Sequence, residues 1–368
     1  MDKKIYVTKP VLPPIEEFVE YLENVWETHD LTNFGTYTKQ LMLELMDFFS
    51  EDYLIPMCNG HMALEMTLQA MELSGEVITT PYTFASTTHA IVRNGLNPVF
   101  CDVRESDCTI DVDKIEALIT EKTSAIVPVH VYGIPCDIER IEAIAKKHNL
   151  KVIYDAAHAF GETVNGKSIS SFGDASMFSF HATKAFNTIE GGCSVVRDIE
   201  TLTRIYQLHN FGIMGEESVE FVGANAKMNE FQAIMGLCNL KHFEENRQKR
   251  KRLFGLYIES LKDVEGIRLL SYDDESVEYN YTYCPIFVDE NKYGKTRNEL
   301  YQVLKDRGIF ARKYFYPITN EFACYKECGF SGNTPIAKKL SEQVLTLPLY
   351  SDLSEEDVVR ITDIIKEI

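Results

Sequence analysis

The sequence lacks the usual signatures of a disulfide framework or a metal site. Its nine cysteines are odd in number and scattered, and no two of them have the Cys-x-x-Cys spacing. No HExxH motif or comparable histidine spacing occurs either, so His130, His181 and His209 are interpreted as structural histidines. We therefore expect reduced, buried thiols and no metal.

Long uncharged apolar stretches are also missing. The first residues, MDKKIYVTKPVLPPIEEF, contain no apolar core of the kind found in signal peptides. No later segment approaches the roughly 18 to 20 uncharged apolar residues that a membrane-spanning helix needs. We expect a cytoplasmic protein that does not interact with a membrane.

Positive charge is scarce relative to negative charge. The chain has 37 lysines and arginines against 56 aspartates and glutamates, which gives a formal net charge of −19. Such a protein repels a phosphate backbone at long range, so nucleic acid is excluded as the main partner. An anionic small substrate would need a local cationic pocket.

The sequence does contain a regular alternation of apolar runs and amphipathic stretches between about residues 55 and 200. The apolar runs are rich in β-branched and aromatic residues and are bounded by turn residues, which is typical of buried strands. Helical spacing occurs between them, for example at 62–73 and 138–150. This alternation predicts an α/β protein with a mostly parallel sheet that is covered on both faces. The predicted strands lie at 75–80, 97–103, 124–133, 151–161, 175–182 and 193–198.

The pattern changes after a long helical stretch at 228–261. A chain of 368 residues is long enough for two domains, and we predict a large domain at 1–240 and a smaller α/β domain at 241–368. The smaller domain should contain strands at 279–289 and 309–318, a helix at 295–308, and a closing helix whose N-cap is Ser354. In the strand at 309–318, Tyr314, Phe315 and Tyr316 should alternate between the core and a substrate.

Three features of the large domain suggest a common chemistry. Asp155 directly follows four strand-forming residues, Lys184 lies among small residues, and Asn59-Gly60 opens a helix whose first amides could bind an anion. Taken singly, these are also explained by a helix cap, a surface lysine and an ordinary turn. Together with Ser179, they provide what a phosphorylated pyridine aldehyde needs: phosphate donors, a carboxylate for the ring nitrogen, and an amine that can form an imine. No GxGxxG string supports a nicotinamide cofactor instead.

Several strings resemble one family in the same order along the chain. SFHATKAFNTIEGG, YDAAHAFG, TTPYTFASTTHA and NAKMNEFQAIMGL are similar to the DegT/StrS family of pyridoxal-phosphate (PLP)-dependent nucleotide-sugar aminotransferases. The resemblance implies a fold-type-I aminotransferase that acts as a homodimer with active sites shared between subunits. It also implies Lys184 as the Schiff-base lysine and Asp155 as the partner of the ring nitrogen, with further cofactor contacts from the amides of Gly60, His61 and Met62, and from Phe84, His158, Ser179 and, in the neighbouring subunit, Asn225. His61 departs from the family, which usually has Thr or Ser there.

The resemblance also suggests substrates. KKIYVTKPVLPPIEEFVEYLENVWE, RKYFYPI and LPLYSDLS are similar to the branch that makes dTDP-4-amino-4,6-dideoxyglucose. This implies transfer of an amino group from L-glutamate, through pyridoxamine phosphate, to the 4-keto group of dTDP-4-keto-6-deoxy-D-glucose. Amination of a 3-keto sugar and a non-catalytic member of the fold remain as alternatives. Related sugar dehydratases have histidine in place of the lysine, and Lys184 argues against that activity.

Overall fold

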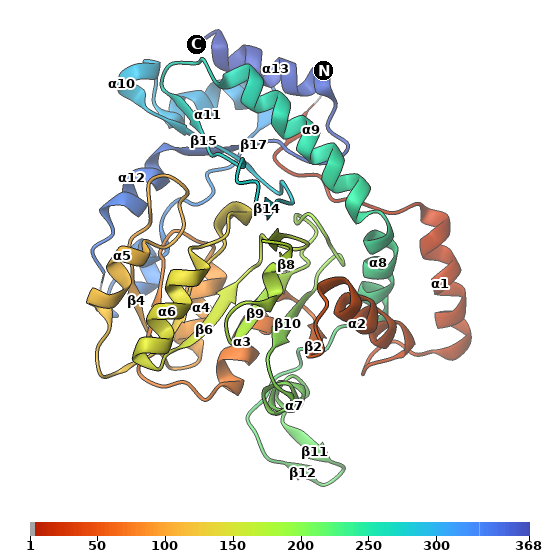
Figure 1. Cartoon of the computed structure of the whole chain (residues 1–368). Helices are drawn as coiled ribbons and strands as arrows, with labels where there is room; N and C mark the ends of the chain where they lie inside the picture. Colours follow the sequence, from red (N-terminus) through yellow and green to blue (C-terminus); the bar gives the residue numbers. More distant parts are fainter. Residues whose placement is uncertain (1–3, 331) are drawn as a thin grey trace.

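A seven-stranded sheet forms the centre of the larger part of the molecule. The structure is a computed structural model that describes residues 4–330 and 332–368 (Figure 1). Neighbouring strands from β9 to β4 run parallel, whereas β10 is antiparallel to both of its neighbours. The predicted mostly parallel sheet is therefore confirmed. The strands follow the order β2 (Leu54–Met57), β10 (Gly192–Val196), β9 (Ala175–Ser179), β6 (Lys151–Asp155), β5 (Thr123–Val127), β3 (Glu76–Thr79) and β4 (Asn97–Phe100).

Helices cover both faces of this sheet, which explains why its strands are apolar throughout. In β6, Val152 and Tyr154 belong to one hydrophobic cluster, whereas Ile153 between them belongs to another. Successive side chains of a strand point to opposite faces, so each face needs its own cover. The first cluster includes residues of α2 (Thr36–Phe49), α6 (Ile138–His148) and α8 (Glu230–Lys241), and the second includes residues of α3 (Gly60–Ala70), α4 (Ala85–Arg93) and α7 (Ile199–Leu208).

The long helical stretch at 228–261 forms two helices rather than one. Helix α8 ends before His242, whose backbone leaves the helical region at φ −104° and ψ 3°, and α9 (Phe243–Leu261) begins at the next residue. Helix α9 then extends to the C-terminal part of the molecule and packs against α13 (Glu355–Lys366) (Figure 1). The two helices thus connect the sheet with the C-terminal part.

The C-terminal part has its own antiparallel sheet and its own core. The hydroxyl of Ser354 accepts a hydrogen bond from the Asp357 amide at 3.1 Å, so the predicted N-cap of α13 is confirmed. Strand β1 (Ile5–Tyr6) pairs with β16 (Ile309–Phe310), and Ile5 is buried in this core. The division of the chain at residue 240 stays a prediction, and the first strand crosses it. The other elements of this part include β13 (Ile267–Leu269), β15 (Cys284–Val288), β17 (Val344–Leu347), α11 (Arg297–Asp306) and α12 (Pro335–Gln343).

Two predicted strands of the C-terminal part are shorter than expected. The strand predicted at 309–318 ends at Phe310, and residues 313–318 form a loop, so the predicted alternation at Tyr314–Tyr316 is wrong. The strand predicted at 279–289 begins only at Cys284. The side-chain amide of Asn280 donates to the His158 carbonyl at 2.7 Å, which ties the preceding residues to the large sheet instead. Both irregular segments lie next to the site described below.

Two other features concern the outside of the molecule. Strands β11 (Ile213–Gly215) and β12 (Ser218–Val219) form a hairpin that projects away from the body (Figure 1). Across residues 4–330 and 332–368, none of the helices has the length and apolar character required to cross a membrane.

Candidate active site

A cavity of about 630 Å³ lies at the carboxyl ends of the central strands and is closed on the other side by the C-terminal part. Strand β6 ends at Asp155 and β9 ends at Ser179, which places both residues at the same edge of the sheet. The structure brings seven of the nine sequence-predicted site residues together here. They are Gly60, His61, Phe84, Asp155, His158, Ser179 and Lys184.

The Lys184 amine lies inside this cavity rather than in bulk solvent. Its Nζ donates a hydrogen bond to the Tyr283 hydroxyl at 3.0 Å. The surrounding walls desolvate the ammonium and lower the pKa of Lys184 to about 8, although Asp155 and Tyr314 oppose the shift. About one tenth of such an amine is neutral near pH 7, far more than for an ordinary lysine. The side chain is therefore suited to attack a carbonyl and to carry a proton.

The Asp155 carboxyl is almost fully buried, with only 3% of its surface exposed. Burial raises its pKa, whereas hydrogen bonds from the Thr87 hydroxyl (2.7 Å) and the Ala157 amide (3.1 Å), and then the charge of Lys184, lower it. No helix begins directly after Asp155, so it does not act as the helix cap considered above. A buried carboxylate of this kind is stabilised by a cation in the cavity, and a protonated pyridine nitrogen is one.

Helix α3 provides anion donors at another side of the cavity. Gly60 and His61 are its first two residues, so their N–H groups have no acceptor within the helix. A Cβ atom at Gly60 would lie only 2.8 Å from the Ser179 Cβ, which explains the glycine and shows how closely this turn approaches Ser179. The two amides and the Ser179 hydroxyl form a plausible phosphate site in chemical terms.

Two neighbouring side chains limit that site. The Met62 amide, which the sequence placed among the phosphate donors, donates to the Asn59 side chain at 2.8 Å and so caps the helix instead. The His61 ring is held by the Ser86 hydroxyl at 2.9 Å and by Glu65 at 3.2 Å. The side chain of His61 is therefore engaged away from the role that a threonine or serine hydroxyl would have.

Aromatic side chains form the remaining walls. Phe84 stands at the beginning of α4 with 61% of its surface exposed, so its ring is free to stack on a ligand. His158 is buried, and its Nδ1 accepts a hydrogen bond from the Tyr132 amide at 3.1 Å. Burial and the charge of Lys184 hold the pKa of His158 well below its ordinary value, so the imidazole is neutral. Its ring lies parallel to Phe315 at 5.6 Å.

The cavity thus fits a phosphorylated pyridine aldehyde in its chemistry. Anion donors, an exposed aromatic ring, a buried carboxyl and an amine with a lowered pKa all face one space. Among the described residues, no cluster of histidine, cysteine and acidic side chains could hold a metal ion.

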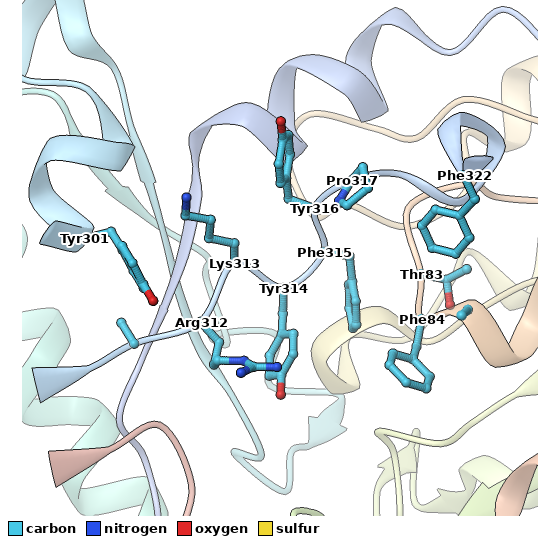
Figure 2. Close-up of a pocket in the computed structure, with 12 residues that line it drawn as sticks. Thr83, Phe84, Tyr301, Arg312, Lys313, Tyr314, Phe315, Tyr316, Pro317 and Phe322 are labelled. Atoms are coloured by element: carbon cyan, nitrogen blue, oxygen red, sulfur yellow. The ribbon is translucent and has the colours of Figure 1, made fainter. Parts of the chain in front are cut away.

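A second pocket of about 400 Å³ adjoins the cavity and shares Phe84, Tyr314 and Phe315 with it. Figure 2 shows Tyr314 and Phe315 projecting to the same side of their loop, toward Phe84. Arg312 and Lys313 also line this pocket, and none of its lining residues is acidic. The pocket therefore supplies the local positive charge that an anionic substrate of this acidic protein requires.

Sequence reasoning missed three residues of these pockets and could not place a fourth. Tyr283, Tyr314 and Arg312 lie in segments that were interpreted as strands, and their sequence carries no signal for the side to which they point. Asn225 is exposed and does not line the cavity of its own chain. Its backbone pairs with Asn210 at the base of the β11–β12 hairpin.

Comparisons with known proteins agree with this geometry. The sequence profile of the DegT/DnrJ/EryC1/StrS aminotransferase family matches residues 14–366. The chain is 42% identical to a dTDP-4-amino-4,6-dideoxy-D-glucose transaminase from Shigella dysenteriae, over the full length of both proteins. It is 34% identical to DesI, solved in the presence of its TDP-sugar product, with a TM-score of 0.95 over 100% of this chain and 93% of that one.

A third similar protein has been solved in two cofactor states. This is the putative sugar aminotransferase Spr1654 from Streptococcus pneumoniae, which is 27% identical to this chain. Its pyridoxamine-phosphate form has a TM-score of 0.92 and covers 99% of this chain and 97% of that one. Its PLP form has a TM-score of 0.90 and covers 98% of each chain.

Proposed function

The chain belongs to the DegT/DnrJ/EryC1/StrS family of PLP-dependent sugar aminotransferases, and we propose that it aminates C4 of dTDP-4-keto-6-deoxy-D-glucose with L-glutamate as donor. The observation that carries this proposal is the shared cavity of Lys184 and Asp155, which opens beside a cationic pocket. The name of the Shigella relative, at 42% identity over the full length, supports the choice of sugar and position.

Each residue of the cavity has a defined task in this proposal. Bound PLP supplies an electron sink for the carbon that loses its proton. Asp155 keeps the ring nitrogen protonated, and the Gly60 and His61 amides with the Ser179 hydroxyl hold the phosphate. Lys184 takes the proton from the glutamate α-carbon in the first half-reaction and returns a proton to the sugar carbon in the second.

The adjoining pocket provides the place for the nucleotide part of the sugar substrate. The Arg312 guanidinium lies 5.5 Å from the centre of the Tyr314 ring, and the Lys313 amine lies 4.9 Å from that of Tyr301. Figure 2 shows these side chains around the loop that carries Tyr314 and Phe315. Cations beside aromatic rings suit a diphosphate that is followed by a flat base.

Substrate position is tested with two sugar nucleotides. Purified enzyme with glutamate should aminate dTDP-4-keto-6-deoxyglucose and leave the 3-keto isomer unchanged, because we assign the chain to the C4 branch. The measurement is product identification by mass spectrometry and NMR. Amine that appears only at C3 contradicts the proposed position, and the absence of amine with both sugars contradicts the enzymatic activity.

We further propose that the enzyme is a homodimer. Apolar side chains of α1 (Ile15–Thr28), among them Ile15 and Trp26, are exposed by 63% and 66%. The β11–β12 hairpin and its neighbourhood likewise expose Met214, Val219 and Val222. A second copy of the chain would cover these residues, and exposed apolar patches of this extent are typical of such interfaces.

Subunit sharing is tested by mixing two defective chains, one with Lys184→Ala and one with Asn225→Ala. Asn225 does not reach its own cavity, so we propose that it donates to the phosphate of the neighbouring subunit. A mixed dimer then contains one site with both Lys184 and Asn225 intact. Activity at low PLP should exceed that of either parent after subunit exchange. If exchange is demonstrated and no gain follows, Asn225 does not act across the interface.

A further inference from the structure

The C-terminal part of the molecule places one hydroxyl group directly on the reactive amine. The Tyr283 hydroxyl accepts the hydrogen bond from Lys184 Nζ at 3.0 Å, and only 5% of the Tyr283 surface is exposed. Tyr283 immediately precedes β15, whereas Lys184 follows β9 of the central sheet. The contact therefore joins two parts of the chain that are 99 residues apart.

The position of this hydroxyl is fixed by its surroundings. The Tyr283 ring packs edge-on against His158 at 4.9 Å and against Tyr132 at 5.8 Å. The segment before it is held by Asn280, whose side chain donates to the His158 carbonyl and accepts from the Thr282 amide at 3.0 Å. A side chain packed on several sides presents its hydroxyl at one place, as positioning of a proton carrier requires.

We propose that Tyr283 is a positioning residue that holds the Lys184 amine in place while the amine carries the substrate proton. The proposal rests on the proposed function, because it assigns a task within the same half-reactions. It adds a residue for which neither the sequence motifs nor the chemistry described above accounts.

The proton balance defines what Tyr283 does. When glutamate has taken the place of the lysine, neutral Nζ removes the α-proton: the C–H bond breaks, its electron pair stays with the carbon, and an N–H bond forms. The resulting ammonium donates to the Tyr283 oxygen until it passes its proton on. Burial raises the pKa of Tyr283, followed by the charge of Asp155, so the phenol stays protonated and acts as a neutral acceptor. A hydrogen bond from a charged donor is stronger than one from a neutral amine, so the contact favours the ammonium.

The first test uses cofactor-free protein and does not depend on activity. The variant Tyr283→Phe removes the hydroxyl and keeps the ring. The pKa of Lys184 is measured from the pH dependence of its labelling by trinitrobenzenesulfonate, with quantitation of the labelled peptide by mass spectrometry. We expect a value near 8 in the parent and a fall of about one unit in the variant, because the charged form loses its acceptor. An unchanged pKa overturns the proposal.

The second test follows the glutamate half-reaction in PLP-loaded protein. Tyr283→Phe should slow it by about 10- to 100-fold while the KM for glutamate stays within about threefold. The isotope effect with α-deuterated glutamate should rise, because proton transfer becomes more limiting. A purely structural role would change PLP occupancy and leave the isotope effect as it was, and that result overturns the proposal.

A matched control separates the hydroxyl from general damage. Tyr281→Phe removes a hydroxyl from the same buried segment, in the C-terminal core and away from Lys184. It should leave both the pKa and the isotope effect unchanged, and an equal change in this variant contradicts a specific role for Tyr283. A parent enzyme that does not react with glutamate contradicts the proposed function, whereas the pKa measurement still decides about Tyr283.

Discussion

Replacement of Lys184 by alanine is expected to reduce turnover by at least about 10³-fold, which corresponds to about 4 kcal/mol of transition-state stabilisation. The variant loses the group that moves the proton in both half-reactions. No neighbouring side chain can substitute for it: Tyr283 stays protonated and His158 is a buried, neutral hydrogen-bond acceptor at Nδ1. The measurement is the rate of sugar amine formation at saturating PLP.

The fold and the phosphate site should survive this substitution. Lys184 is half-buried, and its side chain makes one hydrogen bond, to Tyr283. The donors assigned to the phosphate belong to other residues, so PLP should still bind non-covalently and sedimentation should be unchanged. Lys151→Ala, which removes an exposed lysine paired with Asp174, is the matched control and should keep full activity. Turnover by Lys184→Ala at the parental rate means that the amine is not the proton carrier.

The second large effect is expected at Asp155. Asp155→Asn preserves the size of the side chain and an oxygen that can accept from Thr87, but it removes the negative charge. A neutral amide cannot hold a proton on the ring nitrogen, so the electron sink is weakened. We expect kcat to fall by about 10²- to 10³-fold, the usual cost of losing one preorganised electrostatic contact.

A second buried aspartate provides the control for this prediction. Asp102 is 1% exposed and accepts hydrogen bonds from the Ile336 and Ala337 amides, at the beginning of α12 and outside the cavity. Asp102→Asn should lower thermal stability and leave kcat per folded enzyme unchanged. If Asp155→Asn retains the parental kcat, Asp155 is a structural residue like Asp102.

The sequence predicts those parts of the molecule that depend on local pattern. The alternation of apolar runs and helices predicts the sheet, and strand ends predict the edge at which Asp155 and Ser179 meet. Capping chemistry predicts the beginnings of α3 and α13, because an Asn or Ser side chain bonds to an amide three residues later. The role of Lys184, in contrast, required several motifs together.

Long-range packing decides the rest, and for this reason it was not predicted. Whether residue 283 belongs to a strand depends on Asn280, which bonds to carbonyls about 120 residues earlier in the chain. The loop at 312–317 shows strand-like residues, yet Tyr314 and Phe315 both line the cavity instead of alternating. Asn225 cannot be assigned from one chain, since its proposed partner lies on another copy.

The most direct test of the account is the response of the PLP-loaded protein to glutamate alone. PLP bound through Lys184 gives a visible absorption band, and the account predicts that glutamate abolishes this band while one equivalent of 2-oxoglutarate is released per site. A keto sugar nucleotide added afterwards should restore the band. A band that persists with glutamate, with no oxo acid released, would contradict the claim that this cavity transfers an amino group.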